Sequence, residues 1–221
     1  MKKRDIRLVS VAVLLLAVVS IGAAQMRVGK FGVGLAGTGY YFLQSNLKTL
    51  DPSGGGAVTL TYSIANHVSL RSLMGAGYLA GKQPASVLYP SGRSIETNIY
   101  HWNLALAYDF VPNGRFNPFI YIGGGLLWFD VRDNSGAQIT TSGVTRFDTN
   151  VLGGIGFDVF FNEFWAMSLS AEGVTGFNSW LDGTKGSEND SYGRVSLGLR
   201  YHFFDQGFVK KMLDAFEQRG K

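Results

Sequence analysis

The sequence predicts an all-β fold, an eight-stranded antiparallel up-and-down transmembrane β-barrel, on three observations. The composition combines 30 glycines and 14% aromatic residues with only 16% charged residues, whereas a soluble domain carries about 25% charged residues. Apolar and polar residues alternate at period two along eight segments. Long and short connections between these segments also alternate, as expected of a meander whose two rims face different compartments.

Residues 1–24 have the layout of a cleaved secretory signal peptide. Basic residues dominate residues 1–7, an apolar run occupies residues 9–21, and small residues precede the expected mature start at Gln25. An N-terminal membrane anchor is the alternative, but an apolar run of about 13 residues is shorter than the roughly 20 that a spanning helix needs. Cleavage removes four of the 20 basic and one of the 16 acidic residues. The mature chain is then almost neutral, and nucleic acid is not an expected partner.

After the signal peptide the chain has no uninterrupted apolar run of helix-spanning length, and eight segments show strand alternation instead. In each segment large apolar side chains occupy one face and mainly glycine, serine, threonine and alanine the other. The fifth segment is apolar on both faces, and its three consecutive glycines leave its facing open. The expected strands are residues 30–41, 57–65, 68–79, 97–110, 118–131, 147–160, 165–174 and 192–203.

The connections place both ends of the barrel on one rim. Long polar connections follow the first, third, fifth and seventh strands, and short turns follow the second, fourth and sixth. The long loops are expected at residues 44–56, 80–94, 132–146 and 176–190, and the short turns at residues 66–67, 111–116 and 161–164.

The distribution of bulky residues decides between a soluble ligand-carrying barrel and a membrane barrel. An eight-stranded barrel is just wide enough inside for side chains, so small residues are expected inside and bulky apolar ones outside, against lipid. Aromatic residues near the strand ends predict two interfacial girdles. The expected short-turn girdle is Tyr108, Phe110, Phe161, Phe164, Trp165, Tyr201 and Phe203, and the expected long-loop girdle is Tyr40, Tyr41, Phe42 and Tyr78.

Three stretches carry a family resemblance: FNPFIYIGGGLLWF (residues 116–129), GGIGFDVFF (residues 153–161) and RVSLGLRYHF (residues 194–203). They resemble the outer-membrane β-barrel domain family, which includes the outer-membrane protein A transmembrane region and the eight-stranded porin-family barrels, and the resemblance covers residues 26–204. It implies a bacterial outer membrane with periplasmic termini, and outer-membrane lipid and the outer-membrane assembly machinery as partners. Family members include anchors, narrow or gated pores, adhesins, carriers of small apolar molecules and a few lipid-modifying enzymes, so the motifs specify fold better than function.

The barrel domain is expected to span residues 25–204, with twelve basic and twelve acidic residues. Residues 205–221 are expected to form a C-terminal periplasmic tail. Apolar residues of the tail recur at helical spacing, which fits a short amphipathic helix or, as the alternative, a disordered segment. The tail is too short for a peptidoglycan-binding domain.

Charged residues on the small-residue face predict a polar network inside the barrel. They are Lys30, Arg71, Asp109, Asp158, Glu172, Arg194 and Arg200. Glu172 and Arg194 lie at similar heights on adjacent strands and could pair. The pair is either a gate or binding site for a polar solute, in which case Glu172→Ala raises single-channel conductance, or a structural plug in which unlike charges offset the cost of burial.

Catalytic, metal and cofactor sites are not predicted. The chain has no cysteine. Of its three histidines, His67 is expected in a periplasmic turn and His202 near the periplasmic edge of the membrane, and His101, which faces inward near Asn103, has no identifiable serine partner at membrane-facing height. The acidic loop residues Asp182, Glu188 and Asp190 are interpreted as a solvated loop. The glycine runs lack a phosphate-binding context and are interpreted as tight packing in a small barrel.

The predicted function is therefore non-catalytic: a structural or scaffold role, with narrow passage or binding of a small solute as a further option. The alternative is a surface adhesion protein that acts through its loops. Those loops are expected to expose the apolar and aromatic residues Val87, Leu88, Tyr89, Trp180 and Leu181.

Overall fold

A computed structural model describes residues 30–44, 49–51, 53–83, 92–133, 135–139, 146–177, 179–183 and 189–204. The predicted signal peptide and the C-terminal tail lie outside these residues. The strands are β1 (Phe31–Gln44), β2 (Thr49–Asp51), β3 (Ser53–Ala65), β4 (Val68–Gln83), β5 (Arg93–Asp109), β6 (Phe116–Asp133), β7 (Phe147–Phe160), β8 (Trp165–Gly176) and β9 (Ser191–Phe204).

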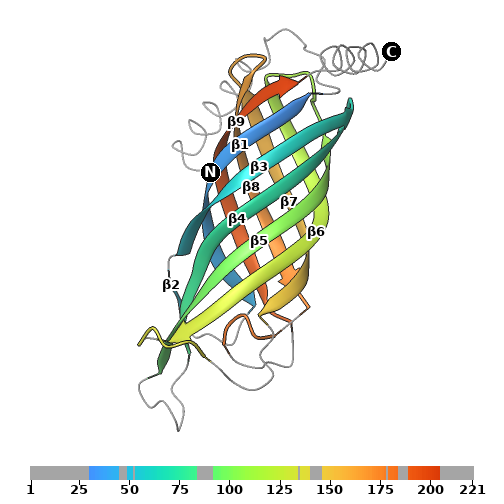
Figure 1. The fold of residues 1–221 in the computed structure, drawn as a ribbon. Helices are drawn as coiled ribbons and strands as arrows, with labels where there is room; N and C mark the ends of the chain where they lie inside the picture. The colour runs from blue at the N-terminus through green and yellow to red at the C-terminus, as the bar shows by residue number, and fades with distance from the viewer. Residues whose placement is uncertain are drawn as a thin grey trace, which may run out of the picture.

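Eight long strands close into an antiparallel barrel (Figure 1), which confirms the predicted fold class. Each long strand pairs with its neighbours along the chain, and β1 pairs with β9 to close the ring. The short strand β2 adds to the end of β4. No helix formed by the described residues is long and apolar enough to cross a bilayer.

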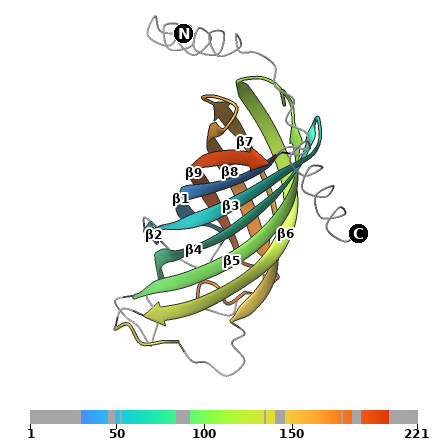
Figure 2. The same cartoon turned by 45° about the horizontal axis from the view of Figure 1, so that its top comes forward.

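Strands β4, β5 and β6 extend beyond the others on the long-loop side (Figure 2). Residues 80–83 and 93–94, expected in a long loop, continue the β4–β5 ladder, and residues 53–56 belong to β3. The loop-side end of β6 is covered by its own connection, because Ile139 N donates to Val131 O at 2.9 Å. The strands are therefore longer than the alternation alone predicts, and their extra length lies at one rim.

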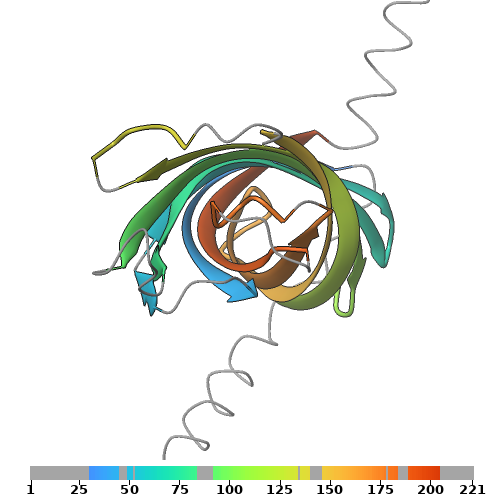
Figure 3. The ribbon, with the colours of Figure 1, turned by 90° about the horizontal axis from the view of Figure 1, so that it is seen from below.

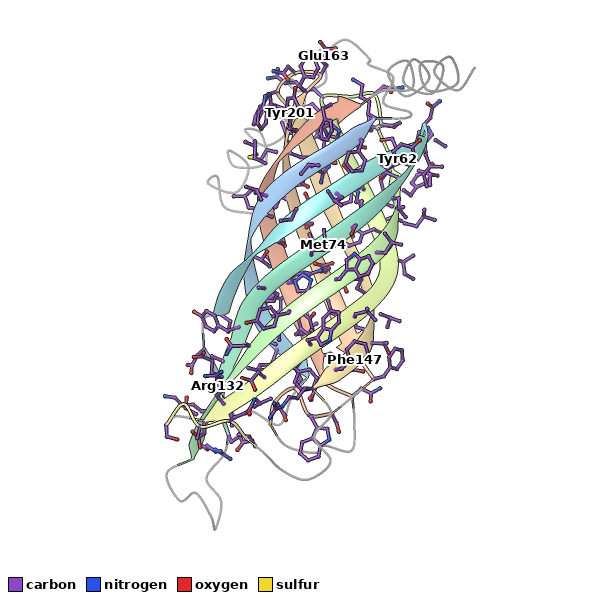
Figure 4. The ribbon with its side chains drawn as sticks, viewed as in Figure 1. Tyr62, Met74, Arg132, Phe147, Glu163 and Tyr201 are labelled. Atoms are coloured by element: carbon purple, nitrogen blue, oxygen red, sulfur yellow. The ribbon has the colours of Figure 1, made fainter. Side chains whose placement is uncertain are left out.

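The two faces alternate as the sequence predicts. Along β5, Trp102 and Leu104 are about half exposed, while His101 and Asn103 are buried. The outward side chains cover the barrel wall, where Met74 is an example from its middle (Figure 4). The facing of β6, which the sequence leaves open, is settled by its burial pattern. Its odd-numbered residues, such as Phe119, point inward.

Aromatic side chains form a ring around the outside at each rim. All seven residues of the expected short-turn girdle are exposed, and Tyr201 lies at that end in Figure 4. On the long-loop side Tyr41 and Tyr78 are exposed as expected, and Tyr100, Trp128 and Phe147 join them. The assignment of Tyr40 and Phe42 to this ring is wrong. Both side chains are buried inside the barrel, because β1 keeps its period of two through them.

The interior is built of small residues only in part. Inward glycines lie directly beneath bulky groups: a Cβ added at Gly154 would meet Tyr121 at 2.6 Å, and one at Gly156 would meet Phe119 at 2.5 Å. Toward the long-loop rim, however, the interior is filled by large apolar side chains. The expectation of a small-residue lumen is therefore wrong in the half of the barrel nearest the long loops. Protein interiors are close-packed, and large apolar side chains fill this half.

Candidate functional site in the barrel lumen

The first group of lumen residues lies nearest the short turns. We call it the turn-side layer, and it consists of Ser69, Arg71, Asp109, Asn117, Asp158, Ser168 and Arg200. Its centre is Asp158 on β7, which is 2% exposed. The Asp158 carboxylate lies 3.1 Å from Arg71 Nη2 of β4 and 3.2 Å from Arg200 Nη1 of β9. The pair with Arg71 connects β7 to β4 across the lumen, and the pair with Arg200 connects β7 to β9, on the far side of β8.

Asp109 completes the charge balance of the turn-side layer. Its carboxylate lies 3.0 Å from Arg71 Nη2 and accepts hydrogen bonds from Ser69 Oγ at 2.7 Å and Asn117 Nδ2 at 2.8 Å. The Arg71 guanidinium also lies 3.5 Å from the centre of the Phe119 ring. Two arginines face two aspartates, so the layer is neutral and its cost of burial is offset by close pairing.

The second group, the middle layer, consists of Tyr40, His101, Asn103, Asn150, Glu172 and Arg194. Glu172 and Arg194 are direct cross-strand partners on β8 and β9, and they form an ion pair through Arg194 Nε. Arg194 Nη1 lies 2.7 Å from His101 Nε2, and the Tyr40 hydroxyl lies 3.0 Å from the same nitrogen. Since a guanidinium can only donate, His101 accepts from Arg194.

Asn103 and Asn150 extend the middle layer to β7. With the Asn103 amide oriented so that its oxygen faces Arg194, that oxygen accepts from Arg194 Nη2 at 3.2 Å, and its nitrogen donates to Asn150 Oδ1 at 3.1 Å. Arg194 is fully buried, so this layer encloses its charge from several sides. The contacts of His101 therefore belong to a closed interior network.

Two glycines of β4 make room for the middle layer. A Cβ at Gly77 would contact the Tyr40 ring, and a Cβ at Gly75 would lie 2.6 Å from His101 Nε2 and 3.0 Å from Gly56 O. Glycine is needed at these positions because ring and backbone approach so closely, not because of an unusual backbone angle.

We predict that Gly75→Ala lowers the free energy of unfolding by about 1–3 kcal/mol, because the added methyl group displaces the His101 ring from a packed interior. The measurement is urea unfolding of the refolded protein in lipid vesicles. Gly37→Ala is the matched control, since a Cβ there meets no atom within 4 Å. Equal stability of the two variants would contradict the packing described for His101.

The third group, the loop-side layer, closes the lumen at the long-loop rim. Its members are apolar or aromatic: Phe42, Leu79, Ile95, Ile99, Leu127, Phe129, Val131, Val174, Leu181 and Tyr192. Leu181 comes from the β8–β9 connection and is 3% exposed. Part of this connection, drawn in orange, lies across the ring of strands when the barrel is viewed from below (Figure 3). The prediction that Leu181 is exposed for adhesion is therefore wrong.

Little free space remains between the layers. A cavity of about 60 Å³ lies between the turn-side and middle layers, where Arg71, Phe119, Tyr121, Glu172, Arg194 and Arg200 line it. Such a volume holds only a few water molecules. Asp158 Oδ1 and Arg200 Nε have no hydrogen-bond partner among the described protein atoms, and water in the lumen is the partner that such buried groups require.

The remaining predicted residues lie elsewhere. Lys30 precedes β1, where its carbonyl accepts from Ser63 N at 3.1 Å, and it joins neither polar layer through the contacts given above. Asp182 and Asp190 are buried at the loop-side rim, so the interpretation of these residues as solvated is wrong. No group of three or more His, Cys, Asp or Glu in the described part of the chain is placed to hold a metal ion. Glu188, Val87, Leu88 and Tyr89 lie outside the described residues.

Sequence reasoning missed the loop-side layer and its partners. Thr97 and Gln83, which contact the inserted connection, carry no motif that marks them. The one available signal is the parity of β5 and β6, because alternate residues of both strands are large and apolar on the inward face at this height. A barrel whose inner face changes from polar to apolar along its axis must close there, since eight strands leave no room for an open channel beside such side chains.

Solved structures with a similar fold are membrane barrels. Neisserial surface protein A matches with a TM-score of 0.55 and 14% identity, covering 78% of this chain and 97% of that chain. OprG from Pseudomonas aeruginosa gives 0.52 and 14%, covering 82% and 99%. Ail, the attachment invasion locus protein of Yersinia pestis, gives 0.51 and 15%, covering 80% and 99%. At these identities the likeness concerns the fold alone. Comparison with curated protein sequences gave no significant match.

A family model supplies the assignment. The model described as outer membrane protein beta-barrel domain matches residues 11–203, which is most of the chain. Together with the closed eight-stranded barrel, this places the protein in the bacterial outer membrane. In such barrels short turns face the periplasm and long loops face outward. The chain belongs to the outer membrane protein beta-barrel domain family.

Proposed function

We propose that the protein is a non-catalytic structural barrel that is closed to solutes and holds its long loops at the cell surface. The observation that carries this proposal is the succession of three layers across the lumen. Two are ion-paired networks and the third is apolar. A solute would have to displace all three in series, and the cavity between the turn-side and middle layers has a volume of about 60 Å³. Outer-membrane lipid around the barrel and the assembly machinery are the partners that this role requires.

The contacts of His101 and His67 support the absence of catalysis. A serine hydrolase needs a histidine that activates a serine hydroxyl and is oriented by an acid. In the described part of the chain, the side-chain hydrogen bonds of His101 go to Tyr40 and Arg194, and His67 Nδ1 contacts the backbone carbonyl of Asp109 at 2.8 Å. His101 is held in the middle layer, where lipid does not reach.

A liposome-swelling assay tests the closed lumen directly. We expect vesicles that contain the refolded protein to swell in isotonic glycine or arabinose no faster than protein-free vesicles. Folding is verified in the same sample by heat-modifiable migration on unboiled gels. Rapid swelling by folded protein would overturn the proposal and favour passage of small solutes.

A surface-interaction role is the second candidate, and the extension of β4, β5 and β6 favours it. Beyond the outer aromatic ring these strands present the polar outward residues Glu96, Asn98, Asp130 and Arg132. Two structures with a similar fold carry the names surface protein A and attachment invasion locus protein. Protease treatment of intact cells distinguishes the roles: if trimmed cells lose adhesion to host-cell or matrix surfaces while the barrel persists, the extension and loops act as the interaction surface.

A further inference from the structure

The β8–β9 connection reaches into the loop-side layer and is held there at its tip. Leu181 lies among the apolar side chains of this layer, and Trp180 packs against the same cluster. Thr97 Oγ1 of β5 donates to Leu181 O at 2.7 Å, and Gln83 Nε2 of β4 reaches Asp182 O at 3.4 Å. We call residues 180–183 the tip segment. Its apolar side chains and backbone together cover the mouth of the barrel.

Asp190, just before β9, fastens the tip segment from the other side. Its Oδ2 accepts hydrogen bonds from Leu181 N at 2.7 Å and Asp182 N at 3.4 Å. Both bonds use the same oxygen, so Oδ1 remains able to carry a proton. The side chain of Asp190 thus connects the inserted tip segment to the root of β9.

The surroundings of Asp190 disfavour its negative charge. Asp190 is 3% exposed and Asp182 is fully buried. The described ionisable groups that act on Asp190 are the carboxylates of Asp182, in the tip segment, and Asp148, on β7. The Asp148 carboxylate itself accepts from Phe177 N at 2.9 Å, at the start of the same connection. Asp190 and Asp148 therefore both bind backbone amides of the connection, and Asp182 brings a third carboxyl group into the same buried region.

We propose that Asp190 is a proton-operated latch: the tip segment closes the barrel mouth when Asp190 is protonated and leaves the mouth when Asp190 ionises. Release hydrates the carboxylate and separates it from Asp182. The turn-side and middle layers stay in place during this movement, because neither contains a residue of the tip segment. The latch therefore controls access to the apolar loop-side layer from the cell exterior, not passage through the whole barrel.

The pH dependence follows from the direction of the shift. Burial, followed by the Asp182 charge, raises the pKa of Asp190 from 3.8 to about 7 in the closed state. A raised pKa stabilises the closed state at low pH, and this stabilisation is lost as the pH rises through about 7. If the released carboxyl returns to its ordinary pKa, the closed-to-open ratio falls about 30-fold between pH 5.5 and pH 8.

Acrylamide quenching of Trp180 fluorescence tests the latch in the refolded full chain. The other tryptophans, Trp102, Trp128 and Trp165, are exposed on the outer wall and are replaced by phenylalanine, so that Trp180 alone reports. We expect Trp180 to be shielded at pH 5.5 and several-fold more accessible at pH 8. Equal quenching at the two pH values would overturn the proposal.

Two variants in the single-tryptophan background sharpen the test. Asp190→Asn keeps an acceptor for both backbone amides but cannot ionise, so Trp180 should stay shielded at both pH values. Asp182→Asn removes a neighbouring charge and should move the midpoint of the change to lower pH. If the pH step persists in Asp190→Asn, another group operates the mouth. Quenching of Trp180 reports only on the mouth of the barrel, whereas liposome swelling reports on passage through the whole lumen. A negative result in one experiment therefore does not decide the other.

Discussion

Replacing Glu172 with glutamine is expected to lower the free energy of unfolding by about 3–5 kcal/mol. Arg194, its partner, is fully buried, so loss of the carboxylate leaves a guanidinium charge in the interior without a counter-charge. Glutamine has nearly the same shape, and a cavity therefore contributes little to the loss. Urea unfolding of the refolded protein in lipid vesicles measures the difference.

The double variant Glu172→Met/Arg194→Met is the control for this result. Replacing a buried ion pair by apolar side chains of similar volume is often neutral or stabilising. We therefore expect the double variant to be more stable than Glu172→Gln. If both variants lose the same free energy, shape complementarity and not the unpaired charge explains the effect.

Because the three layers follow one another along the lumen, they also determine the conductance expected of the Glu172→Ala variant. A gate would open when this carboxylate is lost. The turn-side layer and the loop-side layer, however, still close the lumen on either side of the missing pair. We expect the variant to be destabilised but non-conducting, and a clear conductance increase in planar bilayers would identify the pair as a gate.

Asp158→Asn is expected to have an effect of similar size, about 3–5 kcal/mol of unfolding free energy. Asp158 is the only one of the two turn-side carboxylates that contacts both Arg71 and Arg200. Its neutralisation leaves two buried arginines with one counter-charge, Asp109. The measurement is again urea unfolding, with the wild type as reference.

Asp130→Asn provides the matched comparison for Asp158→Asn. Asp130 pairs with Arg132 at 3.0 Å, and the Arg132 side chain is 49% exposed. Exposed pairs contribute about 0–1 kcal/mol, so this variant should be nearly as stable as the wild type. A similar loss in both aspartate variants would contradict the distinction between the enclosed lumen network and the polar outer surface.

Period-two alternation predicts most of the fold, including the inward facing of Tyr40 and Phe42. On β1 the inward positions include Ala36 and Thr38, so Tyr40 and Phe42 are inward by the same parity. Assigning them to the girdle because aromatics cluster near a strand end overrides the stronger physical constraint. The register of β8 and β9 places Glu172 directly opposite Arg194, which confirms that the two residues lie at the same height on adjacent strands.

The rest of the site depends on information that alternation does not contain. β6 is apolar on both faces because its inward face contributes Leu127, Phe129 and Val131 to the loop-side layer. The parity of β5 and β6 is the one local signal of this apolar interior, and it does not show which residues of the connections enter it. The insertion of Leu181 depends on tertiary contacts with Thr97 and Asp190. The connection that contains Leu181 has no periodic pattern, so its sequence does not indicate which side chains point into the barrel.

Single-channel recording of the wild-type protein in planar bilayers tests the central claim, that three side-chain layers close the lumen. We predict no discrete conductance steps at pH 5.5, where the tip segment covers the mouth. We also predict none at pH 8, where the turn-side and middle layers still close the barrel. Stable open-channel steps from heat-modifiable, folded protein at either pH would contradict the account.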